Sequence, residues 1–115
     1  MRVEVYFVNI KEKSVAQTPE AKVKARAKKI LDSLGAYYFM PATGGFGRSG
    51  VPDIVGCLNG VFFGIECKAG TNKPTALQLK EMQKIGDKGG YCVVVNEDNV
   101  DTLNALPKVL GQRRT

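Results

Sequence analysis

Two apolar segments of the chain meet at Asn59-Gly60, and this dipeptide limits the possible folds more than any other feature. Asn-Gly between apolar runs is the strongest short-range signal of a β-hairpin, because both central residues of the tight turn need a positive φ angle. The flanking segments, residues 53–58 and 61–68, are rich in residues that favour strands. We therefore expect two antiparallel strands joined by a two-residue turn.

This hairpin predicts a meeting of two carboxylates. Counting back from the turn places Asp53 opposite Glu66, and directly opposed residues share a face with Cβ atoms about 4.5–5.5 Å apart. Lys68 follows Glu66 by two residues, so it projects from the same face. Facing carboxylates repel unless a cation compensates them, and we expect a divalent metal ion to do so. Two alternatives are that Lys68 neutralises both acids in a surface ion triad, or that the register is shifted by one residue.

The remaining pattern is typical of a single α/β domain of 115 residues. Thr18, Pro19 and Glu20 supply the cap, the early proline and the first-turn acid that begin a helix, and Gly35 ends it. The other expected elements are a short strand at 36–40, a helix from Thr75 to about Lys88, a strand at 91–95, a helix from Glu97 to about Ala105, and a basic tail from Pro107. This order predicts a mixed sheet flanked by helices. Residues 3–8 are interpreted as an extra edge strand or a dimer-forming arm.

Each of the two longer helices adds one candidate to the site. The first has an apolar stripe of Val23, Ala27, Ile30, Leu31 and Leu34. Glu20 shares that buried face, where it either joins the metal site or only complements the helix dipole. The second has an inward stripe of Leu79, Met82 and Ile85. Gln78 is in phase with it and either orients the site or forms a capping box with Thr75.

The charge pattern favours a polyanionic partner such as nucleic acid. The net charge is +6, and basic residues crowd the first helix at Lys22, Lys24, Arg26, Lys28 and Lys29, with Arg113 and Arg114 near the chain end. The glycine-rich segment 43–52 is no dinucleotide fingerprint, because a strand rather than a helix follows it. It either contacts a phosphate backbone or is a plain surface loop. The candidate DNA-binding residues are Arg48, Ser49, Lys22, Arg26, Lys29 and Lys73.

Several classes of site and location are excluded by composition. The chain has no histidine and only three cysteines, Cys57, Cys67 and Cys92, without a C-x-x-C pair. A structural zinc site and a histidine general base are therefore ruled out, and oxygen ligands favour Mg²⁺ or Mn²⁺. No apolar run is long enough to span a membrane, and the start of the chain lacks a signal-peptide pattern, so we expect a cytoplasmic protein. We also expect no organic cofactor.

Pro52-Asp53, followed thirteen residues later by Glu66-Cys67-Lys68, resembles the PD-(D/E)XK nuclease signature. Together with Gly50-Val51 before it, Glu20 and Gln78, the set resembles the virus-type replication-repair nuclease (VRR-NUC) family in its minimal stand-alone form from phages and bacteria. The resemblance covers about residues 18–96, leaving an N-terminal arm at 1–17 and a C-terminal helix and tail at 97–115. It implies a restriction-endonuclease-like αβββαβ core and metal-dependent hydrolysis of phosphodiesters.

The resemblance also implies a role for each site residue. Glu20, Asp53, Glu66 and the main-chain carbonyl of Cys67 would bind the metal, Lys68 would position or activate the attacking water, and Gln78 would support the site. Stand-alone members resemble dimeric Holliday-junction resolvases of DNA repair and recombination, which implies a homodimer acting on branched DNA. Two other classes stay open, a non-catalytic nucleic-acid-binding module and a metal-dependent phosphatase or nucleotide hydrolase.

Overall fold

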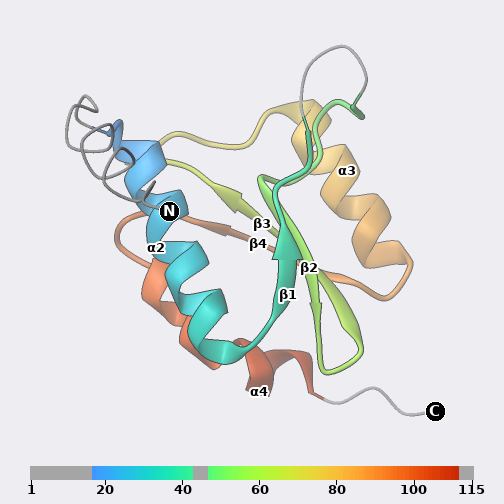
Figure 1. The fold of residues 1–115 in the computed structure, drawn as a ribbon. Coiled ribbons are helices and arrows are strands. Elements are labelled where there is room, and N and C mark those ends of the chain that lie inside the picture. Colours follow the sequence, from blue (N-terminus) through green and yellow to red (C-terminus); the bar gives the residue numbers. More distant parts are fainter. Residues whose placement is uncertain (1–16, 43–46, 112–115) are drawn as a thin grey trace, which may run out of the picture.

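The computed structural model describes residues 17–42 and 47–111. The expected strand at 3–8, Arg113 and Arg114 lie outside these residues. The elements are α2 (Pro19–Leu34), β1 (Tyr37–Phe39), β2 (Ile54–Leu58), β3 (Val61–Cys67), α3 (Ala76–Asp87), β4 (Tyr91–Val95), η1 (Val100–Ala105) and α4 (Leu106–Leu110). The four strands form one mixed sheet in the order β1-β2-β3-β4, with only β3 and β4 parallel (Figure 1). This arrangement confirms the expected α/β class.

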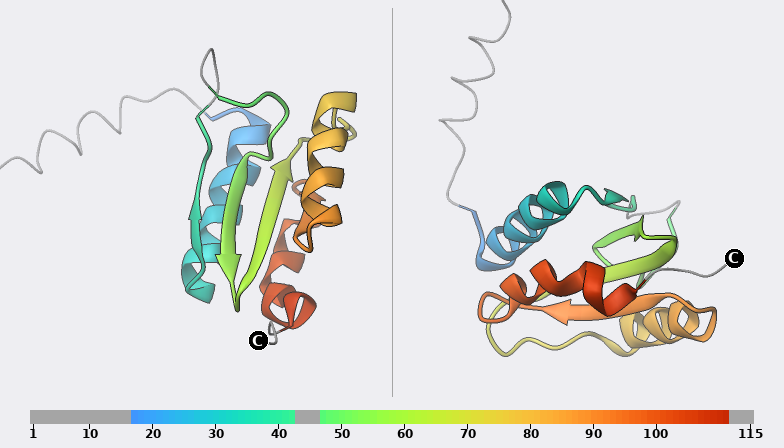
Figure 2. Two further views of the ribbon diagram at one scale, coloured as in Figure 1. Left: turned by 90° about the vertical axis from the view of Figure 1, so that its right-hand side faces the viewer. Right: turned by 90° about the horizontal axis from the view of Figure 1, so that it is seen from below.

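The helices lie on both sides of the sheet. Figure 2 shows α2 on one side and α3 on the other, with η1 and α4 beside α2. The core lies between α2, η1, α4 and one sheet face, and includes Ala27, Leu31, Ile54, Phe63 and Ile65. α3 packs against β3 and β4 from the opposite side. None of the helices in the described part of the chain is both long and apolar enough to cross a membrane.

The boundaries of α2 follow from its caps, as expected. The Thr18 hydroxyl accepts a hydrogen bond from the Ala21 amide at 3.1 Å, and Pro19 occupies the first helical position. Gly35 ends the helix in the left-handed conformation at φ 73°. Val23, Ala27, Ile30 and Leu31 are buried along the predicted stripe.

The register of the hairpin is also confirmed. Leu58 pairs with Val61, and the ladder continues without a slip to Ile54 and Ile65. Asn59 and Gly60 have φ angles of 55° and 80°, the positive values that the tight turn requires. The side chains of β2 and β3 are therefore distributed between the two sheet faces as the sequence predicted.

The C-terminal part differs from the expectation. No helix begins at Glu97, because the Asn96 side chain accepts hydrogen bonds from the amides of Asp98 and Asn99 and so stabilises a turn. The chain becomes helical only at Val100, first as the 3₁₀ helix η1. Pro107 does not begin a tail but lies in the first turn of α4, where its missing N–H costs nothing.

The inward stripe predicted for α3 is partly wrong. Met82 and Ile85 are half-buried, but Leu79 is 54% exposed and Glu81 is the residue that the helix buries. Periodicity gave the phase of the helix but could not show how little of it the sheet covers. An acid on a buried helix face requires a partner, and the partner of Glu81 is Arg48, from the loop that precedes β2.

Candidate active site

Glu66 and Lys68 lie together at the end of β3. The Lys68 ammonium is 3.3 Å from Oε2 of Glu66, and the side chains of Lys68 and Glu66 are only 13% and 2% exposed. The expectation that both residues share a face is confirmed. The other carboxylate oxygen of Glu66, Oε1, is buried and has no hydrogen-bond partner among the described residues. A buried, unpartnered carboxylate oxygen is costly for the fold, and a bound cation would remove that cost.

Asp53 lies one residue before β2, so the backbone ladder does not reach the Asp53–Glu66 pair. Its side chain continues the pairing instead, because Oδ2 accepts a hydrogen bond from the Cys67 amide at 2.8 Å. The carboxylate of Asp53 thus fastens the start of β2 to the end of β3. The predicted proximity of the two acids is supported by the electrostatic influence of Asp53 on Glu66, whereas the hydrogen bond of Asp53 goes to the Cys67 amide and no ladder pair joins the two acids.

The electrostatics of the site fit a divalent cation. The pKa of Glu66 is raised, mainly because the carboxyl is buried and next because Asp53 is close, while Lys68 acts in the opposite direction. Burial, and then Asp53, raises the pKa of the Cys67 thiol to about 12, so this thiol stays neutral. Two neighbouring carboxylates with one oxygen unsatisfied are the hard donors that Mg²⁺ and Mn²⁺ prefer.

No hydrogen bond or ion pair within the described residues joins Glu20 or Gln78 to Asp53 or Glu66. Glu20 is half-buried in the first turn of α2. No group of three or more Asp, Glu, Cys or His side chains within residues 17–42 and 47–111 is arranged to hold a metal ion, so the predicted set of three acids is not assembled. Gln78 and Thr75 form the capping box, with bonds of 2.8 and 3.1 Å. The capping alternative is confirmed, and the site role of Gln78 stays a prediction.

Lys24 was not predicted as a site residue. Its ammonium lies 3.8 Å from Oδ1 of Asp53. Lys24 comes four residues after Glu20, which places the two side chains on one face of α2. This spacing could have indicated that Lys24 lies near the site. All the lysines of the helix were instead interpreted as one basic surface.

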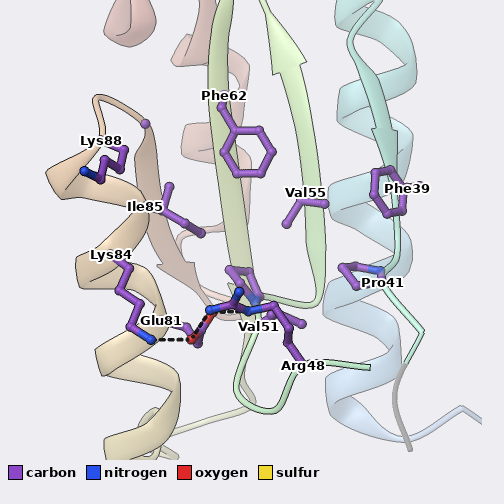
Figure 3. A pocket seen from close by; sticks show the side chains of 12 residues that line it. Phe39, Pro41, Arg48, Val51, Val55, Phe62, Glu81, Lys84, Ile85 and Lys88 are labelled. Atoms are coloured by element: carbon purple, nitrogen blue, oxygen red, sulfur yellow. Dashed lines mark hydrogen bonds and ion pairs between the residues drawn. The ribbon is translucent and has the colours of Figure 1, made fainter. Parts of the chain in front are cut away.

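The loop before Asp53 is fastened to α3 by Arg48. Its guanidinium makes two bonds to the Glu81 carboxylate at 3.2 and 3.1 Å, and Lys84 approaches the same carboxylate at 3.4 Å (Figure 3). Arg48 and Lys84 hold the pKa of Glu81 below its usual value. Gly50, at φ 81°, lies so close to the backbone of Leu77 that a Cβ there would be 2.8 Å from its carbonyl oxygen. Sequence reasoning missed Glu81 because its partner is 33 residues away.

A pocket of about 470 Å³ lies beside this fastened loop. Phe39, Val55 and Phe62 line it with apolar side chains, and Pro52 also belongs to the lining. Phe39 and Phe62 are 51% and 43% exposed. The pocket therefore extends from the site end of the sheet over the face that α2 does not cover.

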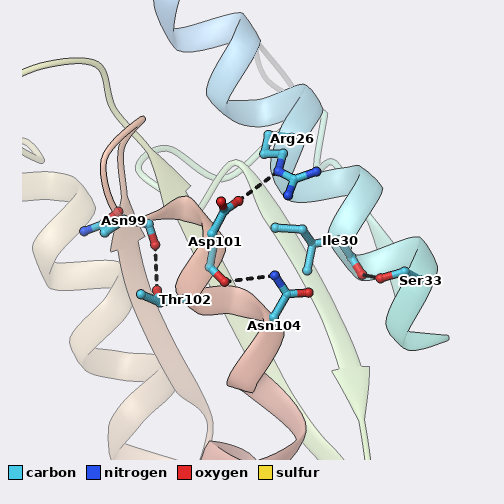
Figure 4. Close-up of polar contacts among 7 residues, drawn as sticks. All are labelled: Arg26, Ile30, Ser33, Asn99, Asp101, Thr102 and Asn104. Carbon is cyan, nitrogen blue, oxygen red and sulfur yellow. Dashed lines mark hydrogen bonds and ion pairs between the residues drawn. The ribbon is translucent and has the colours of Figure 1, made fainter.

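The predicted DNA-binding residues fall into two groups. Ser49, Lys22, Lys29 and Lys73 are exposed, and no ion pair within the described residues engages the three lysines. Arg48 and Arg26 are engaged within the protein, Arg48 with Glu81 and Arg26 with Asp101 at 2.9 Å. Figure 4 shows the second pair joining α2 to η1, next to the hydrogen bond that the side-chain amide of Asn104 donates to the Asp101 backbone carbonyl. The structure thus assigns both arginines an internal contact that the sequence did not predict.

Comparisons with known proteins give two informative similarities. No protein-family model matches the chain. The chain is 41% identical over 64 residues to "Putative nuclease p44" of Acyrthosiphon pisum secondary endosymbiont phage 1, which covers 55% of this chain and 67% of the phage protein. It is also similar to a solved structure described as a VRR_NUC domain, with 30% identity, a TM-score of 0.62, and coverage of 76% of this chain and 95% of the other.

Proposed function

The chain belongs to the VRR-NUC family, and on this premise we propose that it is a divalent-metal-dependent DNA endonuclease of the PD-(D/E)XK type. The similarity to a named nuclease and to a VRR_NUC domain supports nuclease function as such. The observation that carries the metal dependence is the Glu66 carboxylate, buried beside Asp53 with Oε1 lacking a partner among the described residues. A DNA substrate accords with the net charge of +6.

Each site residue has a role in this proposal. Asp53 and Glu66 would hold Mg²⁺ or Mn²⁺, with the Cys67 carbonyl and, after a change of side-chain rotamer, Glu20 completing the ligand set. The ion would supply Lewis-acid stabilisation of the charge that develops on the phosphate. Lys68 is held by Glu66 at 3.3 Å, a position from which its ammonium would orient the attacking water. Gln78 would support the site from the first turn of α3, and residues 18–96 form the catalytic core.

A homodimer that cuts branched DNA, such as a four-way junction in the cytoplasm of a bacterial cell, is the finer form of this proposal. The resemblance to stand-alone family members supports it. Exposed aromatic side chains also support it, since Tyr37 and Phe39 on the edge strand β1 are 72% and 51% exposed. A second copy of the chain would remove such surface from water. Sedimentation that shows only monomer at micromolar concentration would contradict the dimer.

The decisive experiment is a cleavage assay with labelled linear, flapped and four-way DNA and with free nucleotides, in Mg²⁺, in Mn²⁺ and in EDTA. The variants Asp53→Asn and Glu66→Gln keep the shape of each side chain but remove its charge, and each should slow cleavage by at least about a hundredfold. Asp98→Asn, which changes an exposed acid, is the matched control and should cut normally. Wild-type cleavage by either site variant, or cleavage in EDTA, would refute the assignment. Hydrolysis of nucleotides alone would favour the phosphatase class instead.

A further inference from the structure

Lys24 is a charged residue at the site that the proposed function does not use. Its ammonium is 3.8 Å from Oδ1 of Asp53, and the side chains of Lys24 and Asp53 are 36% and 22% exposed. The pair is therefore neither a buried structural bridge nor a fully solvated one. By contrast, Arg26 on the same helix has a closer partner, Asp101 at 2.9 Å, on η1 (Figure 4).

The four carboxylate oxygens of Asp53 and Glu66 are used in different ways. Oδ2 of Asp53 accepts the Cys67 amide, and Oε2 of Glu66 pairs with Lys68. The oxygens that remain for a cation are Oε1 of Glu66, which has no hydrogen-bond partner among the described residues, and Oδ1 of Asp53. Lys24 already stands at Oδ1. A cation that uses both remaining oxygens must therefore approach the position of this ammonium.

We propose that Lys24 is an exchangeable countercharge, which pairs with Asp53 when no metal ion is bound and moves to a DNA phosphate when one binds. A lysine suits this exchange, because its ammonium sits on a flexible four-carbon stem that can swing while α2 stays in place. The repulsion between an ammonium and a divalent cation on the same oxygen drives the move. The phosphate backbone is the anion that receives the released charge. This inference rests on the proposed function, since it presumes a metal ion and a DNA substrate.

The exchange makes metal binding and DNA binding help each other. A metal ion that takes Oδ1 frees Lys24 for DNA, and DNA that attracts Lys24 frees Oδ1 for the metal. By linkage the factor by which each ligand strengthens the other is the same. A Lys24 that acted only as a structural bridge would instead weaken both ligands when it was removed.

The first test measures Mn²⁺ affinity by calorimetry, without DNA. Lys24→Met should bind Mn²⁺ about threefold to tenfold more tightly than the wild type, because the competing charge is gone. Lys24→Gln provides a second variant if the first folds poorly. Lys28→Met removes the same charge one turn further along α2 and should stay within about twofold of the wild type. If the wild type binds Mn²⁺ and Lys24→Met binds it equally or less tightly, the exchange is refuted and the nuclease proposal stands. If the wild type binds no divalent metal at all, both are refuted.

The second test needs neither metal nor cleavage. In EDTA, Asp53→Asn removes the partner of Lys24 and should raise the affinity for a fluorescent DNA duplex, measured by anisotropy. In the Lys24→Met background the same substitution should give a gain smaller by about threefold or more, since there is no ammonium to release. An equal gain in both backgrounds would mean that Asp53 acts only through its own negative charge, and would overturn the exchange.

Discussion

Asp53 contributes both to the stability of the fold, through its hydrogen bond to the Cys67 amide, and to the proposed metal site. Two substitutions separate these contributions. Asp53→Ala removes the acceptor, whereas Asp53→Asn keeps an oxygen that the 2.8 Å amide contact can use. Both variants lose the negative charge. The comparison between them therefore isolates the hydrogen bond.

The size of the difference follows from the burial of Cys67, which is 0% exposed. An amide buried there without an acceptor costs about 1–3 kcal/mol. Asp53→Asn loses the charge assistance of the bond and the ion pair with Lys24, as Asp53→Ala does, and part of this loss is offset because Glu66 no longer faces a second charge. We therefore expect Asp53→Ala to be less stable than Asp53→Asn by about 1–2 kcal/mol, which corresponds to a melting temperature lower by roughly 4–8 °C.

The assay is thermal and urea unfolding of both variants in EDTA, so that no metal contributes to stability. The control pair is Asp98→Ala and Asp98→Asn, which changes an exposed acid in the same two ways and should show little difference. Hydrogen exchange at the Cys67 amide gives an independent measurement, with faster exchange expected in Asp53→Ala only. Equal stability of the two Asp53 variants would show that the hydrogen bond does not contribute to the free energy of unfolding, and would refute this prediction.

Two further predictions concern the loop that leads to the site. Arg48→Met should destabilise the protein at pH 6 but much less at pH 3. The pKa of Glu81 is lowered in the folded state, so its ion pair with Arg48 stabilises the fold above the ordinary pKa of 4.5 and loses this effect as the carboxylate is protonated. A stability difference between wild type and variant that does not change with pH in urea titrations would contradict this prediction. Gly50→Ala should lower the free energy of unfolding by about 1–3 kcal/mol, and by more than Gly35→Ala does. Both glycines have a positive φ, but only Gly50 is crowded by the backbone of α3. Equal melting temperatures for the two variants would contradict the role of that crowding.

The parts of the fold that local rules determine were predictable from the sequence. The hairpin register follows from two turn residues with positive φ, and the bounds of α2 follow from Thr18 and Gly35. Because strand alternation then fixes the faces, the convergence of Glu66 and Lys68 was also predictable. These features depend on residues close together in the sequence.

The remaining features depend on contacts that sequence periodicity does not contain. Glu81 is buried because an arginine from a distant loop reaches it, and Leu79 is exposed because the sheet covers only part of α3. The helical segment after β4 begins only at Val100 because the side chains of Asn96 and Asn99 stabilise the preceding turn. The contact of Asp53 was likewise not predictable, because the backbone pairing of β2 and β3 ends at Ile54 and the Asp53 carboxylate then bonds to the Cys67 amide.

The exposed turn at Asn59-Gly60 lies at the far end of the hairpin from the site, about 20 Å away at 3.4 Å per residue. Surface turns usually tolerate insertions and deletions, yet here the turn sets the spacing of the site residues. Adding or removing one residue in it would shift β3 by one position against β2 and turn Glu66 and Lys68 to the opposite side. We therefore expect loop length at this turn to be constrained, although the turn lies at the opposite end of the hairpin from the proposed site. Variation in length among homologues should be concentrated elsewhere.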